Sequence, residues 1–232
     1  MMKIEYLYFI IPILYTCIHS IDLMSTYSRV AGFHINKNSI GYSIQNATAA
    51  YTRLFNMAML PIIGYLIDKG IETYNFLLIS IVSFFLSGLS LLIIFFNSKK
   101  IVYFFICKIS KLVGVERKFG EFYYPSYPSF VINKKIFLMS IVIYTIHSIG
   151  VLVTFMLATV FSENKVMITQ TTGMINATAT LLLTLKLDPL LSVKIENNDQ
   201  YLEAHASVML ARVVSFFIFS PSILISIYMV VK

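Results

Sequence analysis

The sequence predicts an all-α polytopic membrane protein, with six transmembrane helices in two three-helix inverted repeats and an interfacial basic connector. Of its 232 residues, 58% are hydrophobic and only 12% are charged, and the mean hydropathy is +0.80. Soluble domains are about half apolar and a quarter charged, so this chain has more apolar surface than a soluble fold can bury. The other two observations are six long apolar segments and an internal repeat that divides them into two sets of three.

The apolar segments are long enough to span a bilayer, because crossing about 30 Å of hydrocarbon takes roughly twenty helical residues. The second and fifth segments carry more polar residues than the others, and we expect them to face inward, since polar groups at membrane depth must face protein or water. The first segment runs past the length of a cleavable signal and is repeated later, so we expect it to be a span. The six segments cover residues 6–30, 39–67, 74–96, 136–161, 166–187 and 206–231.

The repeat consists of four motifs that recur in the same order at offsets of 128 to 132 residues. An odd number of spans per repeat inverts the second half relative to the first, as in many secondary transporters, whose site lies near the midplane between the halves. We therefore divide the chain into a first repeat (1–97), a basic connector (98–135) and a second repeat (136–232). The matching motifs are Ile18-His19-Ser20-Ile21 with Ile146-His147-Ser148-Ile149, Asn46-Ala47-Thr48-Ala49 with Asn176-Ala177-Thr178-Ala179, Pro61 with Pro189, and Val82-Ser83-Phe84-Phe85 with Val214-Ser215-Phe216-Phe217.

The net charge of +7 lies mostly in the loops, where lysine and arginine set orientation and meet lipid headgroups rather than nucleic acid. The connector holds most of them, which predicts a cytoplasmic connector with both termini outside. Within it, residues 101–112 are apolar with Lys108 and Lys111 on one side, too short to span, and predict an interfacial helix. An ordinary solvated linker is the alternative.

Polar side chains inside the spans are the candidate functional residues, because a charge at the centre of a membrane helix costs roughly 2.5–3.5 kcal/mol without a partner, water or a ligand. Several share a helix face at three- and four-residue spacing. The second repeat has leucine where the first has Arg29 and Arg53, so the charges are unevenly distributed between the halves. The predicted substrate-binding residues are Arg53, Arg29, Arg212, Asn46, Asn176, Asp22, Thr180 and Asn56.

Three arginines allow two interpretations. A cavity lined by Arg29, Arg53 and Arg212 would suit an anionic group, because guanidinium binds phosphate in a bidentate manner. The alternative is structural pairing, of Asp22 with Arg29 or Arg53, and of Arg212 with Asp188 or with lipid headgroups.

His19 and His147 are related by the repeat and are candidates for a proton relay, with Asp188 as a third coupling candidate. The alternative is that the histidines are neutral and hydrogen-bonded between helices. We find no metal-ligand spacing, no cofactor motif and no nucleophile with a base, so the sequence predicts a transporter rather than an enzyme. We interpret Cys17 and Cys107 as packing residues.

Three stretches of the chain resemble the Amj family, the alternate lipid II flippases of bacteria. They cover most of the membrane part, and the third is the most specific. The first runs from His19-Ser20-Ile21-Asp22 through Tyr27-Ser28-Arg29-Val30-Ala31-Gly32; the second joins residues 43–46 with Arg53-Leu54-Phe55-Asn56 and residues 61–68; the third is Gly173-Met174-Ile175-Asn176-Ala177-Thr178-Ala179-Thr180 followed by Leu187-Asp188-Pro189 and Arg212.

The resemblance implies that the chain moves lipid II, the undecaprenyl-pyrophosphate-linked cell-wall precursor, from the inner to the outer leaflet of the bacterial cytoplasmic membrane. Its implied partners are lipid II and membrane lipids. Arg53 and Arg29 would neutralise the pyrophosphate, Asn46 and Asn176 would bond sugar or peptide, and one half would rock against the other. Two other hypotheses stay open: an exporter of another anionic lipid or small solute, and a non-transporting membrane scaffold.

Overall fold

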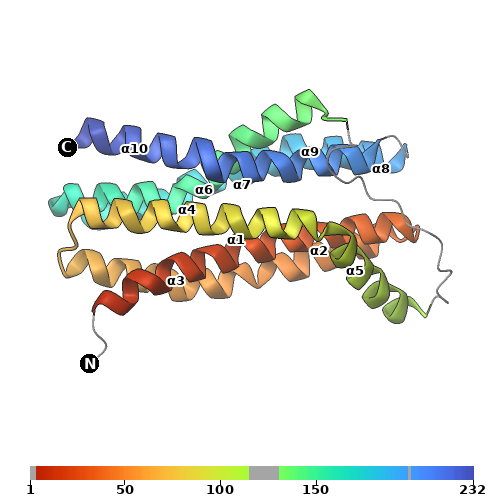
Figure 1. The fold of residues 1–232 in the computed structure, drawn as a ribbon, viewed down its shortest axis with the longest axis horizontal. Helices are drawn as coiled ribbons and strands as arrows, with labels where there is room; N and C mark the ends of the chain where they lie inside the picture. The colour runs from red at the N-terminus through yellow and green to blue at the C-terminus, as the bar shows by residue number, and fades with distance from the viewer. Residues whose placement is uncertain (1–3, 115–130, 198–199) are drawn as a thin grey trace.

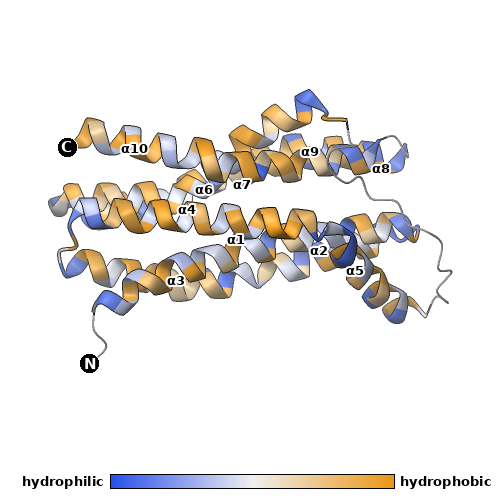
Figure 2. Ribbon diagram, in the orientation of Figure 1, coloured by the Kyte–Doolittle hydropathy of each residue, from blue (hydrophilic) through white to orange (hydrophobic). Residues whose placement is uncertain are grey.

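The computed structural model describes residues 4–114, 131–197 and 200–232, and every regular element in these residues is helical (Figure 1). Six helices or helix runs are long and apolar enough to cross a membrane, which confirms the predicted fold class. Figure 2 shows hydrophobic residues along the middle of these helices and hydrophilic residues gathered near their ends. The spans are Glu5–His34, Asn38–Asp68, Thr73–Phe96, Lys134–Val160, Lys165–Glu196 and Tyr201–Val231.

The first half is a helical hairpin followed by a third span. A short turn with Asn36 in the left-handed conformation (φ 55°) joins the first two spans, and asparagine tolerates this region better than most residues. The second span consists of two helices that meet at Tyr51. The elements are α1 (Ile4–His34), α2 (Asn38–Ala50), α3 (Thr52–Asp68), α4 (Thr73–Phe96) and α5 (Ser98–Val113).

The second half repeats this plan with two interruptions. Asn133 caps the first helix by accepting a hydrogen bond from the Ile136 amide, as N-cap asparagines do. The fifth and sixth spans each contain a π-helical segment between two α-helices. The elements are α6 (Lys134–Val160), η1 (Ser162–Asn164), α7 (Lys165–Leu182), η2 (Leu183–Leu187), α8 (Asp188–Glu196), α9 (Tyr201–Val214), η3 (Ser215–Phe219) and α10 (Ser220–Val231).

The two π-helical segments each lie just before a proline. Pro189 is the second residue of α8 and Pro221 the second residue of α10. Proline has no amide N–H and its ring crowds the preceding turn, so a wider turn lets the helix continue. The first of these segments explains why the fifth span does not end at residue 187, as predicted, but continues to Glu196. The sixth span also begins earlier than predicted, at Tyr201 rather than at 206.

The first helices of the two halves run in opposite directions. In Figure 1, α1 leads away from the end of the bundle that holds both termini, and α6 leads toward that end. Residues related by the repeat contact each other. The ring centroids are 5.8 Å apart for His19 and His147, 6.3 Å for Phe84 and Phe216, and 5.8 Å for Phe85 and Phe217.

Small polar residues hold the interior of each half together. The hydroxyl of Ser20 lies 2.7 Å from that of Ser90, and the repeat-related Ser148 lies 2.6 Å from Ser220. Such residues let membrane helices approach closely and bond to each other. The first and third spans of each half are thus joined by corresponding hydrogen bonds.

The second and fifth spans are the least enclosed of the six, which differs from the expectation that they face inward. In their most apolar windows only 22% and 17% of residues are buried, against 39–61% in the other four spans. Their polar residues therefore line an open side of the bundle rather than a sealed interior. Of the connector, α5 contains the predicted helix at 101–112, whereas residues 115–130 lie outside the described part.

The contact between α1 and α2 generates a stability prediction. A Cβ at Gly41 would lie 2.6 Å from the Ser28 carbonyl oxygen and 2.9 Å from the Gly32 Cα, both backbone atoms that cannot rotate away. We expect Gly41→Ala to destabilise the protein by about 1–3 kcal/mol, the usual range for overpacking, measured by thermal unfolding in detergent. Gly64→Ala, where nothing lies within 4 Å, is the matched control. Equal melting temperatures for the two variants would contradict this packing.

Candidate functional site

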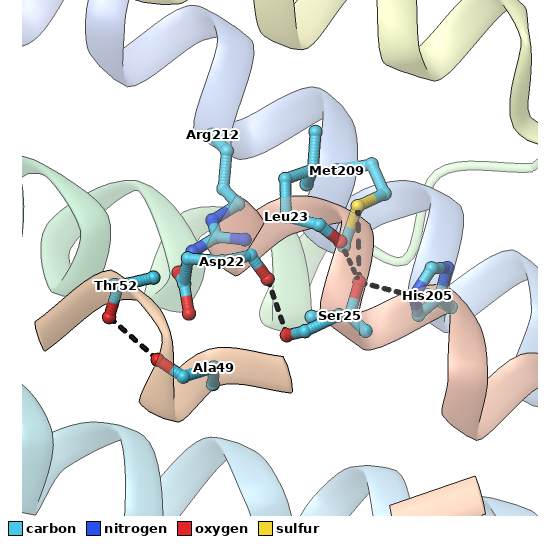
Figure 3. Close-up of polar contacts among 9 residues, drawn as sticks. Asp22, Leu23, Ser25, Ala49, Thr52, His205, Met209 and Arg212 are labelled. Carbon is cyan, nitrogen blue, oxygen red and sulfur yellow. Dashed lines mark hydrogen bonds and ion pairs between the residues drawn. The ribbon is translucent and has the colours of Figure 1, made fainter. Parts of the chain in front are cut away.

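Within the described residues, two ion pairs join the halves, one near the middle of the bundle and one nearer its connector end. The first links Arg212 of α9 to Asp22 of α1, and the Arg212 guanidinium carbon lies 4.0 Å from the ring centroid of Tyr144. Arg212 is only 2% exposed, so it needs both the carboxylate and the aromatic face as partners. Figure 3 shows the Asp22 carboxylate between Arg212 and the segment that carries Ala49 and Thr52.

The second ion pair lies further along α1, toward the connector end of the bundle. Arg29 Nη1 lies 3.3 Å from Asp188 Oδ1, Arg29 Nη2 donates to Ser192 Oγ at 2.6 Å, and the guanidinium carbon lies 5.2 Å from the ring centroid of Tyr42. Asp188 begins α8, directly after the π-helical segment, so the widened turn places this carboxylate against the first half. Arg29 is thereby held by three side chains and is buried.

Arg29 and Arg212 are thus paired structurally, which was the alternative interpretation, but with other partners than that alternative named. Asp22 pairs with Arg212 rather than with Arg29 or Arg53, and Asp188 pairs with Arg29 rather than with Arg212. Each pair takes its cation from one half and its carboxylate from the other. Spacing in the sequence shows which residues share a face of one helix. It does not show which faces of different helices contact each other, so it cannot assign ion-pair partners between helices.

A cavity of about 420 Å³ lies beside the Asp22–Arg212 pair, at mid-span. Of the eight predicted substrate residues, Asp22, Asn46, Arg53, Asn56 and Thr180 line it. Arg29, Arg212 and Asn176 do not line it, and of the three arginines Arg53 is the one in the cavity wall. The complete lining is Ile18, Asp22, Asn46, Ala49, Ala50, Thr52, Arg53, Asn56, Ile143, Tyr144, His147, Ala179, Thr180 and Leu183.

Arg53 is the one arginine of the cavity wall. It lies midway along the second span, in the first turn of α3, and its side chain is exposed. Within residues 4–114, 131–197 and 200–232, no carboxylate forms an ion pair with it. A guanidinium at this depth without a carboxylate partner favours contact with water or with an anion. Arg53 thus differs from Arg29 and Arg212, whose charges are already neutralised.

The amides and hydroxyls of the cavity come from both halves. Asn46 is exposed on α2, and Thr180 is exposed on α7, where its hydroxyl bonds to the Asn176 carbonyl. Asn176, the repeat equivalent of Asn46, instead packs its side-chain oxygen on Gly150, where a Cβ would lie 2.6 Å from it. Gly150 occupies the repeat position of Asp22 (offset 128). At this repeat position the first half therefore has the carboxylate of Asp22, whereas the second half has a glycine that leaves space for the amide of Asn176.

The repeat-related histidines lie at the same level as the cavity. His147 lines it, whereas His19 is buried behind it, with ring centroids 4.4 Å from Tyr15 and 4.7 Å from Phe216. Their rings contact each other between the halves, and their part in coupling stays a prediction. The same holds for Asp188, whose observed contact is the ion pair with Arg29.

Sequence reasoning missed Tyr144, Ser192 and Thr52. Tyr144 lines the cavity and stacks on Arg212; it lies one helical turn before His147, so the helical period could have identified it. Ser192, which accepts a hydrogen bond from Arg29, lies beyond the predicted end of the fifth span. Thr52 stands at the junction of α2 and α3, a break that the apolar pattern does not indicate.

Comparison with known proteins assigns the family. The family model Amj, described as "Alternate to MurJ", matches residues 92–225, more than half of the chain. The chain belongs to the Amj family. No curated protein and no solved structure gives a match. The resemblance inferred from the sequence motifs is thus confirmed. The matched part of this Amj protein includes Asp188 and Arg212, the second-half partners of both ion pairs, while Asp22 and Arg53 precede it.

The Asp22–Arg212 pair generates a second prediction. Arg212→Gln leaves a carboxylate unpaired at mid-span, and Asp22→Asn leaves a buried guanidinium unpaired, so each should cost about 3 kcal/mol of stability. The double variant leaves no unpaired charge. Its loss of stability should therefore be less than half of the sum of the two single losses, because the effects of substitutions at interacting residues are not additive. Thermal unfolding of the four proteins measures the coupling. Strict additivity of the two losses would show that the pair is not an energetic unit.

Proposed function

We propose that this Amj protein is a lipid II flippase, which moves the undecaprenyl-pyrophosphate-linked precursor from the inner to the outer leaflet of the bacterial cytoplasmic membrane. The observation that carries the proposal is Arg53, an arginine with no carboxylate partner among the described residues, in the wall of a mid-span cavity. Family membership supports it, because Amj is described as an alternate to MurJ.

The position of the cavity suits a lipid-linked substrate. Asn46, Arg53 and Thr180 are exposed although they lie far from both ends of their spans, so we interpret the cavity as open toward the side of the bundle. A side opening lets a polar headgroup lie among protein groups while its polyprenyl tail stays in the hydrocarbon. Polar groups at this depth are tolerated only beside protein or water.

The charges of the lining support an anionic headgroup. Arg53 can bind a pyrophosphate oxygen pair in a bidentate manner. Asp22 faces the same cavity, but its charge is balanced by Arg212 from behind, so the lining does not repel an anion as strongly as a free carboxylate would. Asn46, Asn56 and Thr180 offer amide and hydroxyl groups that suit sugar or peptide.

Movement of one half against the other would carry the site from one leaflet to the other, as in transporters with inverted repeats. The two ion pairs cross the boundary between the halves, so such movement must stretch or exchange them. Asp188 of the second pair would then change partners during transport, and His19 with His147 would lie where the halves slide. The positive-inside rule supports a cytoplasmic connector with both termini outside.

The functional test is replacement of Arg53. We expect Arg53→Ala to abolish rescue of cells that lack their other lipid II flippase, with normal insertion and abundance, because the anion loses its one unpaired cation. Arg53→Lys should retain part of the activity, since lysine keeps the charge but not the bidentate geometry.

Lys69→Ala is the matched control, because Lys69 follows the same helix and packs on Tyr65 outside the cavity. Full rescue by Arg53→Ala would contradict the proposed site. Rescue activity lost in all three variants would indicate a general defect instead. Retention of undecaprenyl phosphate in place of lipid II in native mass spectrometry would favour export of another anionic lipid.

A further inference from the structure

Helix α5 leaves the bundle at the end opposite the two termini. Only Asn97 separates it from α4, which ends at Phe96. This short link keeps α5 at the level where a transmembrane span ends and lipid headgroups begin. Figure 1 shows α5 diverging from the bundle axis at that end rather than continuing the span.

The inner face of α5 is packed against the protein. Val102 and Ile109 are fully buried, Phe105 is nearly so, and the helix contacts α1. These residues follow helical spacing, so they occupy one side of the helix. The position of α5 is therefore fixed by its own packing and not by the membrane alone.

The outer face combines cations with exposed apolar side chains. Phe104 is 52% exposed and Leu112 is 71% exposed, which is unfavourable in water over a continuous surface. The Lys108 ammonium lies 5.5 Å from the centroid of the Phe104 ring. This arrangement lets the ring enter the apolar edge of a leaflet while the ammonium reaches its phosphates.

All charged side chains of α5 have the same sign. Its sequence contains Lys99, Lys100, Lys108 and Lys111 and no acidic residue, and all four lysines are exposed. Because no carboxylate on the helix balances them, their counter-charge must come from outside it. A basic amphipathic helix with exposed apolar residues at this depth matches anionic headgroups.

We propose that α5 is a docking surface for anionic phospholipid headgroups in the leaflet on the connector side. The phosphates of a lipid such as phosphatidylglycerol meet Lys100, Lys108 and Lys111, and Phe104 and Leu112 enter the acyl region beneath them. The site is separate from the mid-span cavity, and it stands whether or not the chain transports lipid II.

The test is lipid retention by the full-length protein. Wild type and variants are reconstituted with phosphatidylglycerol and phosphatidylcholine, extracted, and the bound lipids are counted by native mass spectrometry. We expect Lys108→Gln with Lys111→Gln to lower the preference for phosphatidylglycerol roughly 25-fold, since each lysine near a charged surface contributes about a fivefold preference. The control is Lys69→Gln with Lys232→Gln, which removes two cations that also pack on aromatic rings.

An unchanged preference in the α5 variant, or an equal loss in the control variant, overturns the proposal. Wild type supplies a second measurement that does not depend on any variant folding. Its preference for phosphatidylglycerol should fall as salt is raised, because headgroup charges are screened. A preference that is insensitive to salt also overturns it. Lipid II transport is not measured here, so failure of this site and failure of the proposed function are distinguishable.

Discussion

The membrane-spanning part depends on neutralising charge across the boundary between two half-proteins. Asp22 and Arg29 lie on one helix of the first half, and each finds its partner in the second half, in Arg212 and Asp188. Neither half alone could hold its charges in hydrocarbon at small cost. The two ion pairs therefore fix how α1 lies against α8 and α9. They also leave Arg53 as the cation of the cavity wall without a carboxylate partner in the described residues.

The asymmetry between the halves follows from the same constraint. The repeat supplies a common frame, visible where His19 meets His147 and Phe84 meets Phe216. In the repeat, Gly150 corresponds to Asp22. Because Gly150 has no side chain, the side chain of Asn176 can pack against its backbone. The first half contributes Arg53 and Asp22 to the cavity, and the second contributes hydroxyl, imidazole and phenol groups. The second half also carries charge, because Arg212 and Asp188 neutralise the two charged side chains of α1.

Apolar length was sufficient to predict six spans, and the repeat predicted that α1 and α6 run in opposite directions. Three- and four-residue spacing of polar side chains picked out five residues that line the cavity, because a polar stripe on one helix face is visible without a structure. The partners of Asp22 and Asp188 differ from those that the pairing alternative named, because pairing depends on how faces of different helices meet. The fifth span was predicted too short because a proline usually ends a helix, whereas here the π-helical segment before Pro189 lets the chain continue to Glu196.

The proposed function requires a polar, water-accessible cavity at mid-span that holds an anionic lipid headgroup. Cysteine labelling with a membrane-impermeant maleimide, after Cys17 and Cys107 are replaced by serine, measures both properties. We expect Asn46→Cys and Thr180→Cys to react and Leu138→Cys, on the exposed apolar surface, not to react. Added lipid II should protect the first two. Lack of reaction at Asn46→Cys and Thr180→Cys, or reaction that lipid II leaves unchanged, would contradict the proposed function.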